Sequence, residues 1–233
     1  MRSTSKFRRI RSISKVKPTS AWATSAVKRP LRRRPLCWWN VSPEDGAEPI
    51  NKSATARVFF ALWPDPARAL VLADLANAMA SRFAGRSTRT DTVHLTLAFL
   101  GEVPETALPT LCAIAGGIKV PPFELLIDRL GYWPHNQLLW AGCSTSPAAL
   151  LELVNSLQQN LGAAGFAPDR AERHFTPHIS LLRKVPRIFA PGSADPLPKI
   201  QPLPWHCSRW VLVRSHATAP GSNYEVMAEF LLA

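Results

Sequence analysis

The pattern of apolar and polar residues predicts regular secondary structure from about residue 56 to the C-terminus. A strongly apolar run, Arg57–Trp63, has the composition of a buried strand and is stopped by Pro64. Asp65 followed by Pro66 is a typical helix start, because the carboxylate caps backbone N–H groups and proline fits the first turn. Apolar residues then recur at helical spacing to about Phe83. This region therefore opens with a strand and a helix.

The same alternation of strands and helices continues along the rest of the chain. Further strands are predicted at residues 93–100, 123–130, 137–143, 178–182, 205–214 and 224–232, and further helices at residues 105–115 and 147–161. Gly101 is expected to end the second strand, the turn at 133–136 separates two later strands, and residues 186–204 form a Pro-rich connection. Because strands and helices alternate twice, the pattern predicts an α+β fold made of two similar lobes.

The N-terminal segment differs from the rest of the chain in charge. Residues 1–40 hold twelve Lys and Arg and no Asp or Glu, whereas the residues after them hold 16 basic and 16 acidic side chains. The net charge of +12 therefore belongs to residues 1–40. Residues 1–55 are predicted to be a basic disordered tail before a domain at residues 56–233. Three interpretations of the tail remain open: an RNA-attracting arm, a transit-peptide-like targeting segment, or non-native sequence translated upstream of the true start.

The cysteines give no sign of a metal or redox site. Cys37, Cys112, Cys143 and Cys207 lie far apart and form no C-x-x-C pair. Isolated thiols are typical of a reducing cytosol. No stretch approaches the ~20 apolar residues of a membrane span, and the N-terminus lacks the apolar core of a secretory signal. The sequence therefore predicts a cytoplasmic protein that does not contact a membrane.

The histidines are the main candidates for chemistry, because an unperturbed pKa of ~6.5 lets imidazole both take and give a proton near neutrality. A histidine two residues before Ser or Thr places imidazole and hydroxyl on the same face of a strand. Five of the six histidines have this spacing, so their context must distinguish them.

Four histidines lie in contexts that argue against a functional strand. His174 is followed closely by a proline, and His216 runs into the turn residues 219–221. His135 lies in a predicted turn and lacks the hydroxyl partner. His206 begins a plausible strand, and a partly exposed structural histidine is its simpler interpretation.

Two histidines remain, His94 with Thr96 and His178 with Ser180. Each pair has large apolar residues on the other face of its strand, and the two pairs occupy corresponding points of the two predicted lobes. A single histidine in this setting would more often be a core residue. A matched pair favours acid–base catalysis instead.

These residues resemble the two-histidine phosphoesterase superfamily, and within it the bacterial RNA 2',3'-cyclic phosphodiesterases, historically called 2'-5' RNA ligases. The resemblance covers residues 56–233 and rests on Arg57–Leu62, His94–Gly101, Gly165–Asp169, Pro177–Lys184 and Trp210–Val213. It implies a bilobal duplicated fold, in which two antiparallel-rich sheets with flanking helices surround a central cleft. It also implies that no metal or other cofactor is needed.

The resemblance further implies a reaction and a role for each site residue. The chain would hydrolyse the 2',3'-cyclic phosphate at the end of an RNA to a 2'-phosphate, with His178 as general base and His94 as the acid that protonates the 3' oxygen. Thr96 and Ser180 would hydrogen-bond the phosphate. Arg183 is the favoured cationic contact, and a solvated charge at a strand end is its alternative. A monomer is expected.

The same residues are compatible with several other functions. The same site could perform 2'-5' RNA ligation, hydrolyse a small cyclic nucleotide, or bind RNA ends without turnover. A basic-tailed nucleic-acid scaffold is a further possibility. Phe99, Trp63 and Trp133 are candidates for stacking on a base, and the sequence does not rank them. Ser180 stands where threonine is commoner in the family, which keeps the hydroxyl.

Overall fold

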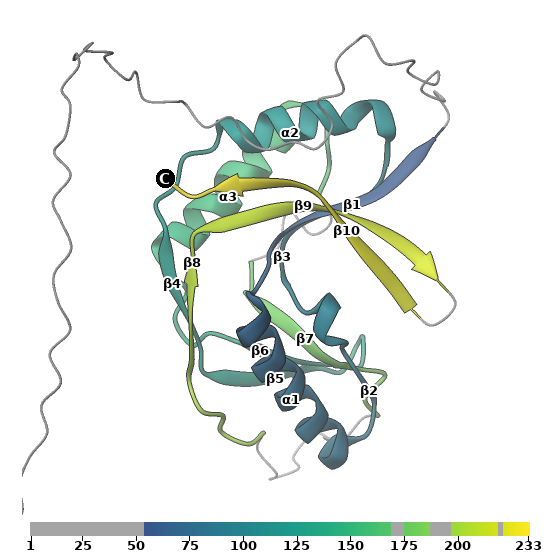
Figure 1. Cartoon of the computed structure of the whole chain (residues 1–233), viewed down its shortest axis with the longest axis vertical. Coiled ribbons are helices and arrows are strands. Elements are labelled where there is room, and N and C mark those ends of the chain that lie inside the picture. Colours follow the sequence, from purple (N-terminus) through teal and green to yellow (C-terminus); the bar gives the residue numbers. More distant parts are fainter. Residues whose placement is uncertain (1–53, 169–174, 187–196, 219–220) are drawn as a thin grey trace, which may run out of the picture. The chain divides into compact units, whose positions relative to one another are not determined.

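The computed structural model describes residues 54–168, 175–186, 197–218 and 221–233. Almost all of the predicted basic tail lies outside the described residues, and so does His174. The described residues form an α+β fold, as predicted (Figure 1).

The described strands and helices are as follows. The strands are β1 (Thr55–Leu62), β2 (Arg86–Ser87), β3 (Leu95–Pro104), β4 (Phe123–Ile127), β5 (Arg129–Trp133), β6 (Leu138–Gly142), β7 (His178–Arg183), β8 (Leu203–Cys207), β9 (Arg209–Thr218) and β10 (Gly221–Leu231). The α-helices are α1 (Pro66–Phe83), α2 (Leu108–Gly117) and α3 (Ala148–Ala163), and two short 3-10 helices are η1 (Thr90–Thr92) and η2 (Glu105–Ala107).

Most strands join one antiparallel sheet with the order β10-β9-β1-β3-β7-β6-β5, and β2 pairs with β7 outside this path. A separate two-stranded sheet contains β4 and β8. Strands β3 and β7 join the two halves of the large sheet through one residue pair, Leu95 with Ile179. The sequence predicts a separate sheet for each lobe. In the structure the two sheets are continuous, because the backbones of β3 and β7 approach closely enough to pair at Leu95 and Ile179.

The helices cover the sheet, and α1 begins where the sequence predicts, whereas α2 begins three residues after the predicted start at residue 105, behind the 3-10 helix η2. The Asp65 carboxylate accepts a hydrogen bond from the Arg68 backbone N–H at 3.0 Å, and Pro66 occupies the first turn of α1. Helix α1 packs beside β7 and β2 (Figure 1). Helix α2 packs against β10, and α3 packs against β3. None of the helices in the described part of the chain is long and apolar enough to span a membrane.

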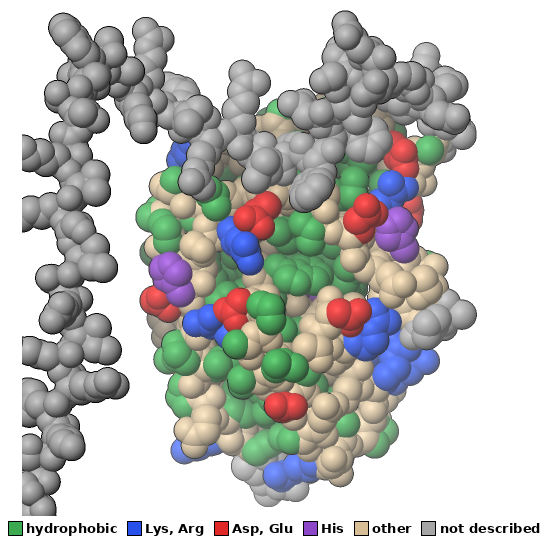
Figure 2. Space-filling view, in the orientation of Figure 1, with side chains coloured by type: hydrophobic (Ala, Val, Ile, Leu, Met, Phe, Trp, Pro, Cys, Tyr) green, Lys and Arg blue, Asp and Glu red, His purple; other side chains and the backbone are tan. Residues whose placement is uncertain are grey.

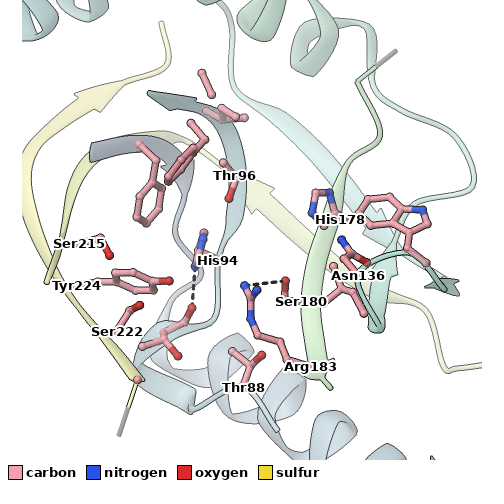
Figure 3. Close-up of a pocket in the computed structure, with 18 of the residues that line it drawn as sticks. Thr88, His94, Thr96, Asn136, His178, Ser180, Arg183, Ser215, Ser222 and Tyr224 are labelled. Atoms are coloured by element: carbon pink, nitrogen blue, oxygen red, sulfur yellow. Dashed lines mark hydrogen bonds between the residues drawn. The ribbon is translucent and has the colours of Figure 1, made fainter. Parts of the chain in front are cut away.

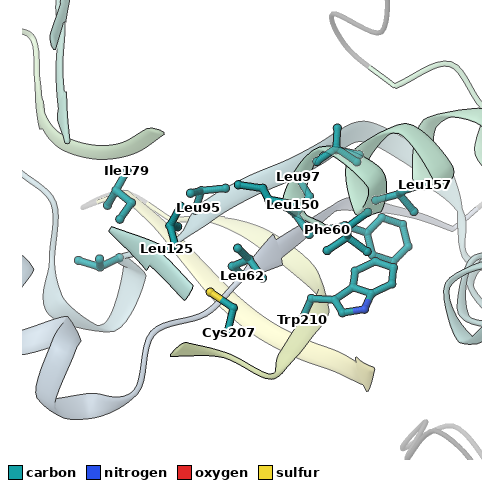
Figure 4. Close-up of a cluster of buried hydrophobic side chains, with 14 of the residues drawn as sticks. Phe60, Leu62, Leu95, Leu97, Leu125, Leu150, Leu157, Ile179, Cys207 and Trp210 are labelled. Carbon is teal, nitrogen blue, oxygen red and sulfur yellow. The ribbon is translucent and has the colours of Figure 1, made fainter. Parts of the chain in front are cut away.

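One apolar core runs through both halves of the sheet. Leu95 and Ile179 are fully buried in it, together with Phe60 and Trp210 (Figure 4). Each such side chain stabilises the fold by about 1.5–3 kcal/mol when it leaves water. A smaller apolar cluster on the other face of β1 and β9 contains Phe59, Ala61, Val211 and Val213. This second cluster underlies the cleft described below.

The predicted end of the second strand at Gly101 is wrong. Strand β3 continues through Gly101 to Pro104, and Gly101 adopts φ 69° beside a shift in the pairing with β1. Glycine tolerates this backbone conformation, so it forms a bulge here instead of ending the strand. His94 lies immediately before β3.

Two other predicted strands are each divided in the structure. The strand predicted at residues 123–130 is interrupted at Asp128, and the one predicted at 205–214 is interrupted at Ser208. The reason is a change of partner, because β4 pairs with β8 whereas β5 pairs with β6.

Candidate active site

The two candidate histidines share one cleft of about 900 Å³ between the two halves of the sheet. Thr96, Ser180 and Arg183 also line it. Figure 3 shows His94 and Thr96 on one side of the cleft, facing His178 and Ser180 on the other.

The single pair between β3 and β7 explains how the four side chains meet. Leu95 lies opposite Ile179, and both point into the core. Extending this antiparallel register by one residue in each direction places His94 opposite Ser180 and His178 opposite Thr96. Each imidazole therefore faces the hydroxyl of the other motif, all on the cleft face.

Both imidazoles are oriented in the same way by the backbone. His94 Nδ1 lies 2.7 Å from the Thr92 carbonyl oxygen, and His178 Nδ1 lies 2.9 Å from the Thr176 carbonyl oxygen. Because a carbonyl only accepts, Nδ1 carries the proton and donates in both rings. The neutral rings therefore hold their lone pair on Nε2, the nitrogen that is suited to exchange a proton with a ligand.

Aromatic side chains surround His94. The Trp63 ring stacks on it at 5.4 Å with an interplanar angle of 6°, Phe59 lies at 4.8 Å, and Tyr224 meets it edge-on at 5.2 Å. Burial of the charged ring, with smaller contributions from Arg183 and His178, lowers the pKa of His94 to about 4, against the opposing effect of its bond to Thr92. His94 is therefore neutral at pH 7 when the cleft is empty.

His178 is supported from a different direction. The Trp133 ring meets it edge-on at 4.6 Å and packs in turn against Trp140 at 5.2 Å. Trp140 lies opposite Gly131 in the β5–β6 pair, and a Cβ atom at Gly131 would collide with its ring. The bare glycine thus gives Trp140 the space to lie over β5.

Arg183 reaches the cleft because of a bulge in β7. The pairing with β6 passes from Ser180 directly to Leu182, which leaves Leu181 as an extra residue. The extra residue shifts the alternation of side chains, so Arg183 turns to the same face as Ser180. An Arg183 guanidinium nitrogen donates to the Ser180 hydroxyl at 3.4 Å (Figure 3).

The three aromatic residues that the sequence left unranked now differ in position. Phe99 and Trp133 line the cleft, whereas Trp63 packs behind His94. The Arg57 guanidinium lies over the Phe99 ring at 4.9 Å from its centre. Phe99 and Trp133 are therefore the two of the three that a ligand can reach.

The other described histidines differ in their surroundings. His206 pairs with Glu124 at 2.6 Å and His216 with Glu225 at 3.0 Å, both at the surface. His216 lies in β9, which continues past the predicted end of this strand at residue 214 to Thr218 in its pairing with β10. His135 lines the cleft, although its sequence context argued against function.

Several further residues line the cleft that no sequence pattern singles out. Arg57, Arg86, Arg89 and Tyr224 line the cleft from β1, β2, the segment before η1, and β10. No local spacing marks them, since tertiary pairing brings them together. Together with Arg183 they give the described lining four arginines and no Asp or Glu. Among the described residues, no group of three His, Cys, Asp or Glu is placed to hold a metal ion.

Comparisons with known proteins show which family the chain resembles. The model of the family described as LigT like Phosphoesterase matches residues 62–140. An RNA 2',3'-cyclic phosphodiesterase from Escherichia coli is 40% identical over 100 residues, covering 43% of this chain and 56% of that protein. One from Thermus thermophilus is 30% identical over 148 residues, covering 60% of this chain and 72% of that protein.

A solved structure extends the comparison to the fold. Escherichia coli LigT complexed with 3'-AMP matches with a TM-score of 0.66 and 27% identity, over 77% of this chain and 99% of that one. Fold and sequence together define the class of two-histidine phosphoesterases. Within that class, the chain belongs to the family of LigT-like phosphoesterases.

Proposed function

We propose that the chain is an RNA 2',3'-cyclic phosphodiesterase that opens a terminal cyclic phosphate to leave a 2'-phosphate. The observation that carries this proposal is the placement of His94 and His178 in one arginine-lined cleft, each held by an Nδ1–H bond to the backbone. The names of the Escherichia coli and Thermus thermophilus relatives support it, although the match covers only 56% of the former.

The reaction needs one proton taken and one proton given. The oxygen of a water molecule attacks phosphorus, and the bond from phosphorus to the 3' oxygen breaks. His178 Nε2 takes the proton from the attacking water, and protonated His94 gives its Nε2 proton to the departing 3' oxygen. The two rings exchange protonation states, so proton transfer through solvent restores the starting form.

The acid role of His94 depends on the ligand. Its pKa of about 4 leaves the ring neutral in the empty cleft, whereas a bound phosphodiester brings a negative charge beside it. An adjacent anion stabilises imidazolium and raises its pKa. Substrate binding therefore supplies the condition under which His94 can hold the proton that the reaction requires.

The polar neighbours would bind the non-bridging oxygens of the phosphate. The Thr96 and Ser180 hydroxyls donate hydrogen bonds, and Arg183 adds a positive charge beside Ser180. Hydrogen bonds to a charged group contribute about 1.5–3 kcal/mol each. Those that strengthen as charge develops lower the barrier itself.

The two halves of the sheet also support a duplicated, bilobal origin of the site. The bulge of β7 at Leu181 has a counterpart in β3, where the pairing with β1 passes from Thr96 directly to Ala98 and leaves Leu97 as an extra residue. Leu97 and Leu181 each follow their histidine by three residues. We further propose that residues 56–233 act on RNA ends as a cytoplasmic monomer. Removal of residues 1–55 should therefore preserve the activity.

Substitution of each histidine tests the mechanism. His94→Ala and His178→Ala should each lower turnover of an RNA with a 2',3'-cyclic phosphate end by ~10²–10⁴. His206→Ala is the matched control, because His206 lies at the surface beside Glu124. Phosphorus NMR of the product identifies the bond that breaks. Turnover near that of the unmodified protein in either cleft variant would exclude that histidine from catalysis, and a 3'-phosphate product would reverse the assignment of the leaving oxygen.

A further inference from the structure

Two arginines lie directly opposite each other at one end of the cleft. Arg86 of β2 pairs with Arg183 of β7, and both line the cleft. Directly opposite residues of an antiparallel pair share one face of the sheet, with Cβ atoms about 4.5–5.5 Å apart. Like charges in this position repel each other, and a bound anion relieves the repulsion. Arg183 also donates a hydrogen bond to the Ser180 hydroxyl of the candidate active site.

A third arginine converges on the same place. Arg89 is held by the Asp91 carboxylate at 3.0 and 3.1 Å, by the Asn223 side-chain oxygen at 3.0 Å and by the Ser222 carbonyl oxygen at 3.3 Å. A Cβ atom built on Gly221 would lie 3.8 Å from a guanidinium nitrogen of Arg86 and 3.9 Å from one of Arg89. Both guanidinium groups therefore lie beside Gly221 at the start of β10, on the side of the molecule where Figure 2 shows Lys and Arg side chains together.

Thr88 supplies a second kind of observation. Its backbone N–H donates to the Leu181 carbonyl oxygen at 2.8 Å, which fixes the residue beside β7. Its side-chain hydroxyl is buried and has no hydrogen-bond partner within the described ranges of the chain. A buried polar atom without a partner is costly, so such an atom at the wall of a cleft indicates a ligand contact. Thr88 lines the cleft below Arg183 (Figure 3).

From these contacts we propose a second phosphate subsite, formed by Arg86, Arg89 and Thr88, for the internucleotide phosphate on the 5' side of the terminal nucleotide. The inference rests on the proposed function. An arginine guanidinium donates charge-assisted hydrogen bonds to phosphate oxygens. In Arg89 the donor would be Nη1, because Nε and Nη2 bond Asp91, Ser222 and Asn223. A cyclic mononucleotide lacks this phosphate, whereas any RNA end carries it. The subsite therefore makes the enzyme prefer RNA ends to cyclic mononucleotides.

Two substrates with the same 2',3'-cyclic phosphate distinguish the contribution of this subsite from that of the catalytic site. Adenosine 2',3'-cyclic phosphate lacks the internucleotide phosphate, and the dinucleotide ApA with a 2',3'-cyclic phosphate end has it. The full chain should show a higher kcat/KM for the dinucleotide. Arg86→Ala and Arg89→Ala should each lower the ratio of the two kcat/KM values by about tenfold, the lower range expected for one hydrogen bond to a charged group. Arg209→Ala removes an exposed charge on β9 that pairs with Glu229 of β10, and it should keep the ratio.

Salt dependence gives a second measurement that does not depend on a variant. The logarithm of kcat/KM should fall more steeply with the logarithm of salt concentration for the dinucleotide, by about 0.7 for one additional phosphate contact. Equal kcat/KM values for the two substrates, or a ratio that Arg86→Ala and Arg89→Ala leave unchanged, would overturn the subsite while leaving the proposed function intact. Hydrolysis of neither substrate by the unmodified chain would remove both proposals together.

Discussion

The change in the pKa of His94 when a phosphate anion binds is the most direct test of the electrostatics of the cleft. Burial lowers the pKa of this imidazole to about 4 in the empty cleft. A phosphate anion bound beside it should form a charge-assisted hydrogen bond worth about 1.5–3 kcal/mol. At 1.36 kcal/mol for each pKa unit, this bond should raise the pKa by about 1–2 units, to about 5–6.

Proton NMR titration of the histidine side chains, with and without inorganic phosphate, measures this change directly. The resonance of His94 is assigned by its absence in His94→Ala, and His206, outside the cleft, serves as an internal control. Linkage requires that phosphate then bind more tightly as the pH falls from about 6 toward 4. A His94 pKa near 6.5 in the free protein would show that the ring is hydrated, and a pKa unmoved by saturating phosphate would show that no anion binds beside it. Either result would refute the reasoning for its acid role.

Further predictions concern stability and packing. Because folding lowers the pKa of His94 from 6.5 to about 4, the unfolded chain binds one more proton than the folded chain between these pH values. The contribution of His94 to folding stability is therefore full above pH 6.5 and falls by at most about 3 kcal/mol as the pH drops to 4. Urea denaturation at several pH values should find a smaller loss in His94→Ala. Gly131→Ala should destabilise the fold by about 1–3 kcal/mol, because the new methyl group collides with Trp140, and should also lower turnover through Trp133 and His178. Gly162→Ala, whose methyl group meets no atom within 4 Å in α3, should be neutral or raise the melting temperature slightly, and equal melting temperatures of the two glycine variants would contradict the packing argument.

The elements that the sequence predicts well are those set by local chemistry. Helix α1 begins at the residue where a capping carboxylate and a proline coincide, and its last residue is the predicted Phe83. Strand ends were predicted less well, because the partner strand decides them. Nothing near Asp128 in the sequence shows that the chain leaves β8 there to pair with β6.

The site shows the same division between local and tertiary information. The side-chain alternation of a strand placed His178 and Ser180 on one face, and the structure has them there. The same alternation would turn Arg183 away from the cleft. Only the bulge at Leu181, which arises from the register with β6, brings it back. Arg86 and Arg89 have no sequence signal, because their common position depends on the pairing of β2 with β7 and on the β9–β10 hairpin.

The pairing of Leu95 with Ile179 explains why two short motifs are enough to specify the cleft. In each motif a buried residue is flanked by a histidine before it and a hydroxyl after it, so the register of one antiparallel pair places each imidazole opposite the hydroxyl of the other motif. A shift of the register by one residue would place a histidine in the apolar core and a leucine or isoleucine in the cleft. The burial of Leu95 and Ile179 therefore favours the same register that the proposed chemistry needs, so the packing of the core and the geometry of the site support each other.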